Sequence, residues 1–253
     1  MVRGQTTYHY NAMRFPSVNR STTLVEDVCA LITRESRKAP GADEWLPPER
    51  QLAEKLCVSR QVVREATKRL ELQGILEVCH GVGTRVVNRL HSPLNRSFEL
   101  LMPDRDDRFT KLTEMRVMVE PQLASLAASR ASHEDLQAMR LAQSNLESAE
   151  TQEAAVLADM EFHRALAKAA GNPIAELMLE SLAELGKASR SQTIGMVGKA
   201  PALAHHATIL EAIEARKPDT AAKAMAAHLG AIELHLLKET SHARPKKPLA
   251  ARS

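Results

Sequence analysis

One carboxylate and three imidazoles in the second half of the chain have the chemistry and the helical spacing of a metal site. Asp159 and His163 stand four residues apart in ADMEFHRALAKAAGNP, which places both side chains on one face of a helix. His206 and His228 each share a helical face with aliphatic residues and are expected to point inward, whereas His205 is turned away by about a hundred degrees. Such a set suits a borderline divalent ion, with Zn, Ni or Mn as the candidates.

Each of these histidines also has a simpler explanation. Taken singly, a histidine at such a position is more often a packed, hydrogen-bonded residue than a metal ligand. His235 also lies near the face of His228 and shows how readily chance supplies further candidates. Spacing by itself therefore leaves both interpretations open.

A second group of residues, near the N-terminus, has the chemistry for reading DNA. Ser59, Arg60 and Gln61 begin an expected helix, and Arg64 lies one turn beyond Arg60 on the same face. Arginine pairs with guanine O6 and N7 in a bidentate manner, and Ser or Gln side chains reach bases or phosphates. Alone, these residues would form an ordinary solvated stripe. The helix before them and the hairpin after them favour a DNA-reading helix.

The elements that carry this group follow from the sequence periodicity. Helices are expected over residues 22–36 and 49–56, and a third runs from Ser59, its N-cap, to about residue 73, just before Gly74. Two short strands, 75–79 and 84–88, flank a glycine-containing turn. Three helices followed by a hairpin predict a winged helix-turn-helix.

The rest of the chain has a helical pattern, so we predict a mainly α protein with an all-α helical-bundle domain after the winged helix-turn-helix. The helices are expected at 109–130, 133–150, 151–170, 173–194, 201–216 and 218–240. The expected domains are a flexible arm at 1–20, the DNA-binding domain at 21–90, a linker at 91–107, a metal- and effector-binding domain at 108–240 and a disordered basic tail at 241–253.

Charge and composition favour the same division of the chain. Residues 1–90 carry fourteen Lys or Arg against ten Asp or Glu, and the remainder carries twenty against twenty-one, so only the first part is suited to phosphate. Cys29, Cys57 and Cys79 are too scattered for a disulfide framework or a zinc knuckle and are expected to be small buried hydrophobes. With no long apolar run and no signal peptide, we expect a cytoplasmic protein without membrane contact.

The first half resembles the DNA-binding domain of the GntR family of bacterial regulators. The resemblance rests on LPPERQLAEKLCVSRQVVREATKRLELQGILEV followed by HGVGTRV, with VSRQVVREA as its strongest part, and covers about residues 22–88. It implies that Arg50, Arg60 and Arg64 contact DNA and that Ser59 and Gln61 support the first turn of the recognition helix.

The resemblance also extends to the hairpin. It implies that His80 and Gly81, at the tip of the wing, reach the minor groove. The loop RKAPGADEWLP is longer than the family's usual proline-glycine turn, a departure that concerns the geometry of the loop and not the DNA contacts.

The second half resembles the FCD ligand domain of the FadR-type GntR regulators, over about residues 109–238. The matching features are Asp-x3-His, a histidine before a TILEAI-like stretch and a histidine in an AAHL-like stretch. Metal-binding members of that family use the positions of Asp159, His163, His206 and His228, and members without metal lack the histidines. The resemblance therefore implies a divalent metal ion held by these four side chains.

Two further positions match the family pattern for the effector. Arg116 stands where family members direct an arginine into the cavity, and a guanidinium is a natural bidentate partner for a carboxylate. A salt bridge to Glu120, four residues on, explains Arg116 nearly as well. Asn172, in AGNP, either lines the pocket or caps the following helix. The implied effector is a small carboxylate or sugar acid.

These features together predict a homodimeric DNA-binding transcription regulator rather than an enzyme. Its affinity for double-stranded operator DNA would be controlled by a carboxylate bound at the metal, and repression is the commoner mode in the family. Two other interpretations stay open. One is an all-α metal-dependent hydrolase that activates water, for which no spare carboxylate is evident. The other is a DNA-binding protein whose metal is purely structural.

Overall fold

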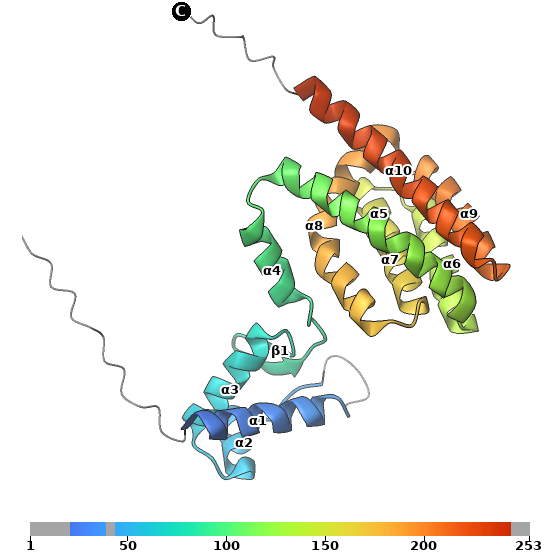
Figure 1. The fold of residues 1–253 in the computed structure, drawn as a ribbon. Coiled ribbons are helices and arrows are strands. Elements are labelled where there is room, and N and C mark those ends of the chain that lie inside the picture. The colour runs from blue at the N-terminus through green and yellow to red at the C-terminus, as the bar shows by residue number, and fades with distance from the viewer. Residues whose placement is uncertain (1–20, 39–43, 244–253) are drawn as a thin grey trace, which may run out of the picture. The chain divides into compact units, whose positions relative to one another are not determined.

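The computed structural model describes residues 21–38 and 44–243 (Figure 1). The chain divides into two compact units between residues 89 and 90. The mainly α architecture agrees with the prediction. The expected arm at 1–20, the turn at Pro40 and Gly41, and residues 244–253 of the expected tail lie outside the described residues. Residues 241–243, also assigned to the tail, instead belong to the last helix.

The first unit is the predicted winged helix-turn-helix. Its elements are α1 (Ser21–Ser36), α2 (Glu49–Leu56), α3 (Arg60–Leu72), β1 (Leu76–Cys79) and β2 (Gly83–Val86). The two strands pair antiparallel, with Leu76 opposite Val86 and Cys79 opposite Gly83. Val28 of α1, Val63 and Leu70 of α3 and Leu76 of β1 meet in one apolar core. The helices and the hairpin therefore share a single core that fixes α3 relative to the wing.

Local sequence signals set both ends of α3. The Ser59 side chain accepts a hydrogen bond from the Val62 backbone N–H, which satisfies one of the free donors of the first turn. Gly74 follows the helix with φ of +74°, a conformation that favours glycine. Before α3, Cys57 adopts a left-handed conformation with φ of +54° and is exposed, contrary to the expectation that all three cysteines are buried. Cys29 and Cys79 are partly buried.

The segment before α2 supports the wing. The Leu46 N–H donates to the Thr84 carbonyl at 2.8 Å, and Trp45 forms a β-bridge with Arg85. The Trp45 ring lies over Gly83, where an added Cβ would come within 3.3 Å of the ring. The hairpin thus has a third extended segment along one edge and an aromatic ring packed near its turn.

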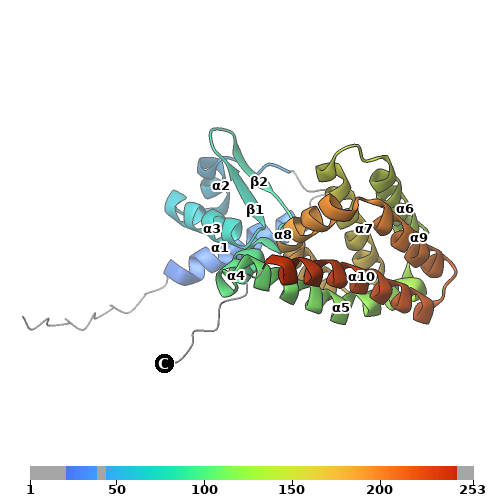
Figure 2. The ribbon, with the colours of Figure 1, turned by 90° about the horizontal axis from the view of Figure 1, so that it is seen from above.

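The second unit is entirely helical in its described residues (Figure 2). It contains α4 (Ser92–Leu101), α5 (Arg105–Arg130), α6 (His133–Ser148), α7 (Gln152–Ala169), α8 (Pro173–Val197), α9 (Ala200–Glu214) and α10 (Pro218–Ala243). Helix α10 lies along α5, and α6 packs on α7. Their core is aliphatic apart from Phe162. Among the described helices, none combines the length and apolar character needed to span a bilayer.

The segment expected to be a linker contains a helix. Helix α4 occupies residues 92–101, and α5 begins at Arg105, also inside the expected linker. Pro93 was interpreted as a linker residue, but it lies in the first turn of α4, where proline is tolerated. Phe98 of α4 packs against Leu112 of α5 and Leu182 of α8. Helix α4 is therefore part of the second unit.

Candidate functional site

The residues predicted to read DNA lie on the surface of the first unit. Arg60, Gln61 and Arg64 are exposed on α3, and Ser59 caps its first turn. Arg50 is exposed on α2. The helix N-terminus adds partial positive charge to this region.

Arg64 is held by a neighbouring carboxylate. Its guanidinium donates to Glu49 at the start of α2, with Nη2 3.0 Å from Oε2 and Nε 3.3 Å from the same oxygen. The side-chain hydrogen bond and the charge of Glu49 raise the pKa of Arg64 above its ordinary value. Arg50 lies 3.9 Å from Glu54 on its own helix. The ion pair therefore orients the Arg64 guanidinium, and no spacing pattern along the chain had indicated this contact.

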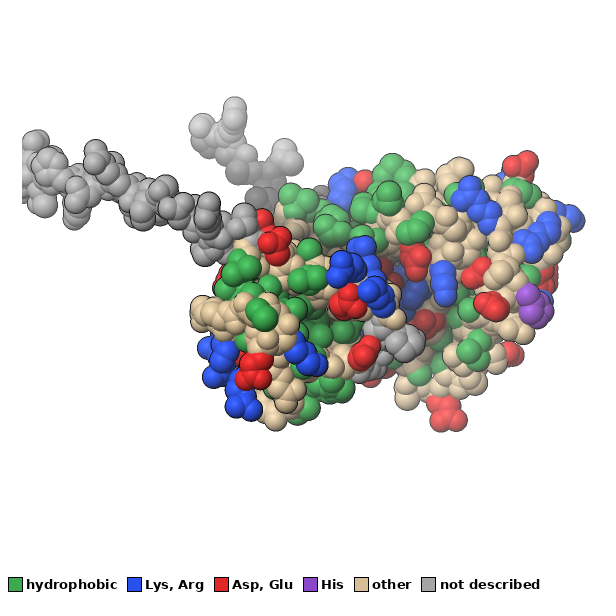
Figure 3. All heavy atoms as spheres, turned by 90° about the horizontal axis from the view of Figure 1, so that it is seen from below, with side chains coloured by type: hydrophobic (Ala, Val, Ile, Leu, Met, Phe, Trp, Pro, Cys, Tyr) green, Lys and Arg blue, Asp and Glu red, His purple; other side chains and the backbone are tan. Residues whose placement is uncertain are grey.

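A groove runs between the helices and the wing of this unit. It is lined by Arg50, Arg60 and Thr67 on the helices and by His80 and Gly81 on the wing. His80 and Gly81 are both exposed, and Gly81 has φ of +78°, with open space where a Cβ would lie. On the face seen in Figure 3, Lys and Arg side chains are interspersed with Asp and Glu side chains.

Four buried side chains of the second unit converge on one point. Asp159 and His163 come from α7, His206 from α9 and His228 from α10, and one ligand atom of each lies within 4.8 Å of all the others. His228 Nε2 is 3.2 Å from His163 Nε2, and His206 Nε2 is 3.4 Å from Asp159 Oδ1. The structure thus brings together all four residues of the sequence-predicted set.

The donor atoms of this cluster have the state that a metal ion requires. Neither ring nitrogen of His206 makes a hydrogen bond, nor does Nδ1 of His228, although all three atoms are buried. Burial lowers the pKa of His206 to about 3 and that of His228 well below its ordinary value, so both rings are neutral near pH 7. Buried polar atoms without partners cost free energy, and a cation removes that cost. The cluster therefore fits a divalent metal ion.

The carboxylate and the third imidazole complete the set. Burial raises the pKa of Asp159, but the charges of His163, His206 and Arg190 outweigh it, and the net result is a pKa well below the ordinary value. Asp159 is therefore anionic. Phe162 stacks on His206 with ring centroids 3.9 Å apart and planes within 7°, which fixes the orientation of that imidazole.

A carboxylate that the sequence analysis did not assign to the site orients His163. Glu120 Oε2 lies 2.6 Å from His163 Nδ1. A hydrogen bond from Nδ1 leaves Nε2 to face the other ligands, the arrangement usual for metal-bound histidines. Burial raises the pKa of Glu120, but Arg116 and His163 outweigh it and hold the pKa well below its ordinary range. The expectation that no further carboxylate lies near the cluster was wrong.

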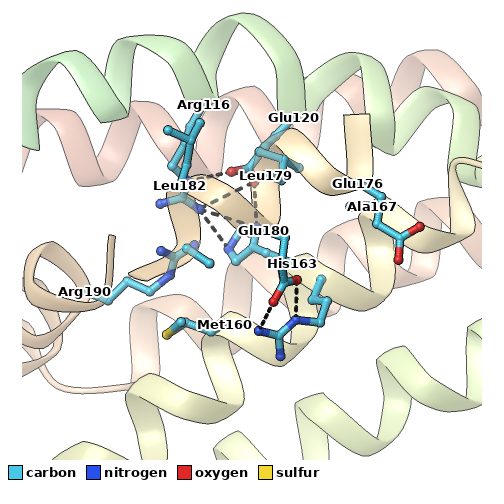
Figure 4. A pocket seen from close by; sticks show the side chains of 12 residues that line it. Arg116, Glu120, Met160, His163, Ala167, Glu176, Leu179, Glu180, Leu182 and Arg190 are labelled. Carbon is cyan, nitrogen blue, oxygen red and sulfur yellow. Dashed lines mark hydrogen bonds and ion pairs between the residues drawn. The ribbon is translucent and has the colours of Figure 1, made fainter. Parts of the chain in front are cut away.

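Both sequence-based explanations of Arg116 hold in the structure. Its Nε donates to Glu120 Oε1 at 2.5 Å, the predicted i,i+4 salt bridge, and its Nη2 lies 3.2 Å from His163 Nε2. The buried guanidinium also lines two cavities next to the cluster. Arg116 therefore serves the internal network and faces space that a ligand can fill (Figure 4).

Arg190 is a functional candidate that the sequence analysis missed. It extends from α8, is buried, and its Nε donates to Asp159 Oδ2 at 2.7 Å. It lines the same two cavities as Arg116. Burial and the positive charge of Arg116 both lower the pKa of Arg190. Two buried arginines, Arg116 and Arg190, therefore border the cluster in the described part of the chain.

Two expectations about neighbouring residues need correction. Asn172 is exposed and lines neither cavity; its Oδ1 accepts hydrogen bonds from the backbone N–H groups of Ile174 and Ala175, which makes it the N-cap of α8. His205 is half-buried rather than turned away, and its ring centroid lies 5.5 Å from that of His228. The expectation was wrong because α10 packs against α9, which brings the His205 ring close to that of His228.

The capping role of Asn172 can be tested separately from the metal cluster. Asn172→Ala removes the acceptor for two backbone donors and is expected to lower the free energy of unfolding by about 1 kcal/mol. Metal content is expected to stay at the wild-type level, since the side chain is outside the cluster. Chemical denaturation and elemental analysis check the two expectations. Loss of metal without loss of stability would contradict the capping role.

Comparison with known proteins agrees with this architecture. Residues 31–86 match the model of the bacterial regulatory proteins of the gntR family, and residues 111–231 match that of the FCD domain. The chain is 36% identical over 162 residues to the Uxu operon transcriptional regulator of Escherichia coli (strain K12), a match that covers 62% of each chain. It is 32% identical over 193 residues to the HTH-type transcriptional regulator LutR of Bacillus subtilis (strain 168), covering 72% of this chain and 86% of LutR.

A solved structure gives the same result. Streptococcus agalactiae GntR superposes with a TM-score of 0.67 at 29% identity, covering 85% of this chain and 99% of that one. These relatives are regulators, which argues against the alternative of a metal-dependent hydrolase. The chain, with its winged helix-turn-helix and its helical ligand domain, therefore belongs to the GntR family of bacterial DNA-binding transcription regulators and carries an FCD domain.

Proposed function

We propose that this regulator is a homodimeric, FadR-type repressor whose operator affinity is set by a small carboxylate bound at a divalent metal ion in the FCD domain. The observation that carries the proposal is the buried cluster of Asp159, His163, His206 and His228, whose unpartnered imidazole nitrogens lie beside arginine-lined cavities.

For DNA, we assign base contacts to the exposed arginines of α3. Arg60 and Arg64 would enter the major groove from the first turns of the helix, with Ser59 and Gln61 supporting that end. Arg50 would add a DNA contact from α2. In the wing, His80 and Gly81 would reach the minor groove, where the absence of a side chain on Gly81 lets the backbone approach closely.

For the metal, we assign the four clustered side chains as ligands. Zn, Ni and Mn all suit one carboxylate and three imidazoles. When bound, the ion would supply positive charge, and a coordination number above four would let it also accept a carboxylate oxygen. Glu120 holds His163 in place, and Arg116, bonded to Glu120, contributes a guanidinium at the edge of the cavity.

The second unit also contains a physical route from this cavity toward the DNA-binding unit. Leu182 of α8 lines one cavity and belongs to the same apolar cluster as Phe98 of α4. Glu180 of α8 lies 4.0 Å from His91, the residue at the start of α4, and pairs with Arg164 of α7. A ligand that shifts α8 would therefore shift α4, which directly follows the DNA-binding unit in the chain. This coupling requires the ligand to bind two conformations unequally.

The regulatory coupling has a direct test. Zinc-loaded protein is screened with lactate, malate and gluconate, and operator binding is then measured with and without the acid that binds. We expect a change in operator affinity of about 5–150-fold, the range of a coupling of about 1–3 kcal/mol. In His163→Ala, shown to be metal-free, the acid is expected to have no effect while basal DNA binding persists. An unchanged response would leave the metal with only a structural role.

The dimer and the direction of control are tested separately. A two-fold dimer places one recognition helix on each half-site of a palindrome. We expect analytical ultracentrifugation with operator duplex to give two chains per operator. We also expect the two protected half-sites to be separated by one helical turn of DNA or a multiple of it. Deleting the gene is expected to raise expression from its operator-bearing promoter. One chain per duplex, or a fall in expression, would contradict the homodimeric repressor.

A further inference from the structure

Two buried arginines from different helices border the same cavities beside the candidate metal cluster. Arg116 of α5 is salt-bridged to Glu120, and Arg190 of α8 is salt-bridged to Asp159. Figure 4 shows both side chains entering the pocket from different helices. A guanidinium has more N–H donors than one carboxylate can accept, so both arginines keep donors for an anion at these cavities.

Helix α8 is locally shaped to hold the Arg190 guanidinium. Gly186 lies one turn before Arg190 and is buried. A Cβ at this position would collide with Nη1 of Arg190 and would lie 3.3 Å from Cδ2 of Leu112. Glycine inside a helix is unfavourable by about 1 kcal/mol relative to alanine. The absence of a side chain at Gly186 thus leaves space for the Arg190 guanidinium, although glycine makes the helix less stable at this position.

The charges of these buried groups define the charge of the ligand. Among the buried side chains that the structure describes, the guanidiniums of Arg116 and Arg190 are paired with the carboxylates of Glu120 and Asp159. Imidazoles that bind a metal ion are neutral. A divalent metal ion at the cluster adds two positive charges with no further buried carboxylate to match them. An uncompensated buried charge strongly destabilises a protein. A monoanion would neutralise only half of the excess.

We propose that the effector is a dianion, a small dicarboxylate. This proposal rests on the proposed metal- and carboxylate-binding function. One carboxylate belongs at the metal-ligand cluster, and the other belongs with the arginine pair, for which Arg190 is the specificity-determining residue. The cavity that both arginines and Asp159 line is also lined by Ser189 and Thr193, residues whose hydroxyls suit a hydroxyl substituent on the ligand.

A matched pair of acids tests the charge of the ligand. Malate and 2-hydroxybutyrate share a four-carbon skeleton and a 2-hydroxyl group and differ in one carboxylate. In calorimetric titrations of zinc-loaded protein, we expect malate to bind at least about tenfold tighter, a difference of about 1.4 kcal/mol. Equal affinities would overturn the dianion while leaving a carboxylate effector in place. Binding of neither acid would contradict the proposed function, and the dianion with it.

Two variants assign the preference to Arg190. Arg190→Gln removes one positive charge, and Gly186→Ala displaces the guanidinium by adding a single methyl group. Each is expected to reduce the malate to 2-hydroxybutyrate affinity ratio to below about threefold, with zinc content unchanged. Lys187→Gln, on the same helix but outside the cavity lining, is the control and should keep the wild-type ratio. An unchanged ratio in both variants, with native circular dichroism, would overturn the role of Arg190.

Discussion

Alanine at Arg64 is expected to weaken operator binding by about 1–3 kcal/mol, or roughly 5–150-fold at fixed salt. The reason is the loss of a bidentate base contact from the recognition helix. Equilibrium binding to an operator duplex and to a scrambled duplex measures the effect, and the loss should be larger for the operator. Affinity for both duplexes should fall steeply with added salt, because phosphate contacts release counterions.

The control for this prediction lies on the same helix. Arg69 pairs with Glu65 at 3.3 Å and is half-buried, so it is not placed to contact DNA. Arg69→Ala is expected to change operator affinity much less than Arg64→Ala. Glu49→Gln weakens the hold on the Arg64 guanidinium and should shift specificity more than overall affinity. Wild-type affinity in both Arg60→Ala and Arg64→Ala would show that another element reads the operator.

The second large effect concerns the metal. Purified protein is expected to contain about one divalent ion per chain, and His228→Ala is expected to lose it together with a large part of the thermal stability. Binding to the native state alone stabilises a protein by about 2.7 kcal/mol when the free ligand is at 100 times its dissociation constant. Elemental analysis and thermal melts followed by circular dichroism check both losses, with metal readdition restoring only the wild type.

A histidine outside the cluster serves as the control. His133 is exposed at the start of α6 and hydrogen-bonds only to Gln137, so His133→Ala should keep the wild-type metal content. His205 is unsuitable, because its ring approaches His228. Equal metal in the wild type and in His228→Ala would remove His228 from the ligand set.

Sequence patterns predicted the elements because these depend on spacing along the chain, whereas the resemblance to the FCD domain was needed to group the four clustered side chains. Ser59 and Gly74 marked the limits of α3 through capping chemistry that acts within a few residues. Asp159 and His163 share a helical face by geometry alone. The prolines at 173 and 218 likewise fell at helix starts, as predicted.

Other features depended on packing between distant segments. Arg190 contacts Asp159 thirty-one residues away, and no periodicity connects the two. Glu120 was visible only as a partner of Arg116, whereas its contact with His163 requires α5 to lie on α7. Helix α4 was missed because its stability comes from Phe98 packing on other helices, which outweighs the nearby prolines.

Trp45 at the edge of the wing has a practical consequence. It is the single tryptophan of the chain, and its ring is half-exposed beside Gly83, at the border of the groove between the helices and the wing. Indole fluorescence depends on the polarity and water content around the ring. Because Trp45 is the single tryptophan, selectively excited emission comes from this one position beside the wing. Operator binding at this groove is therefore expected to change the intrinsic tryptophan fluorescence of unlabelled protein. Ligand binding in the second unit is expected to change this fluorescence only when it alters the wing.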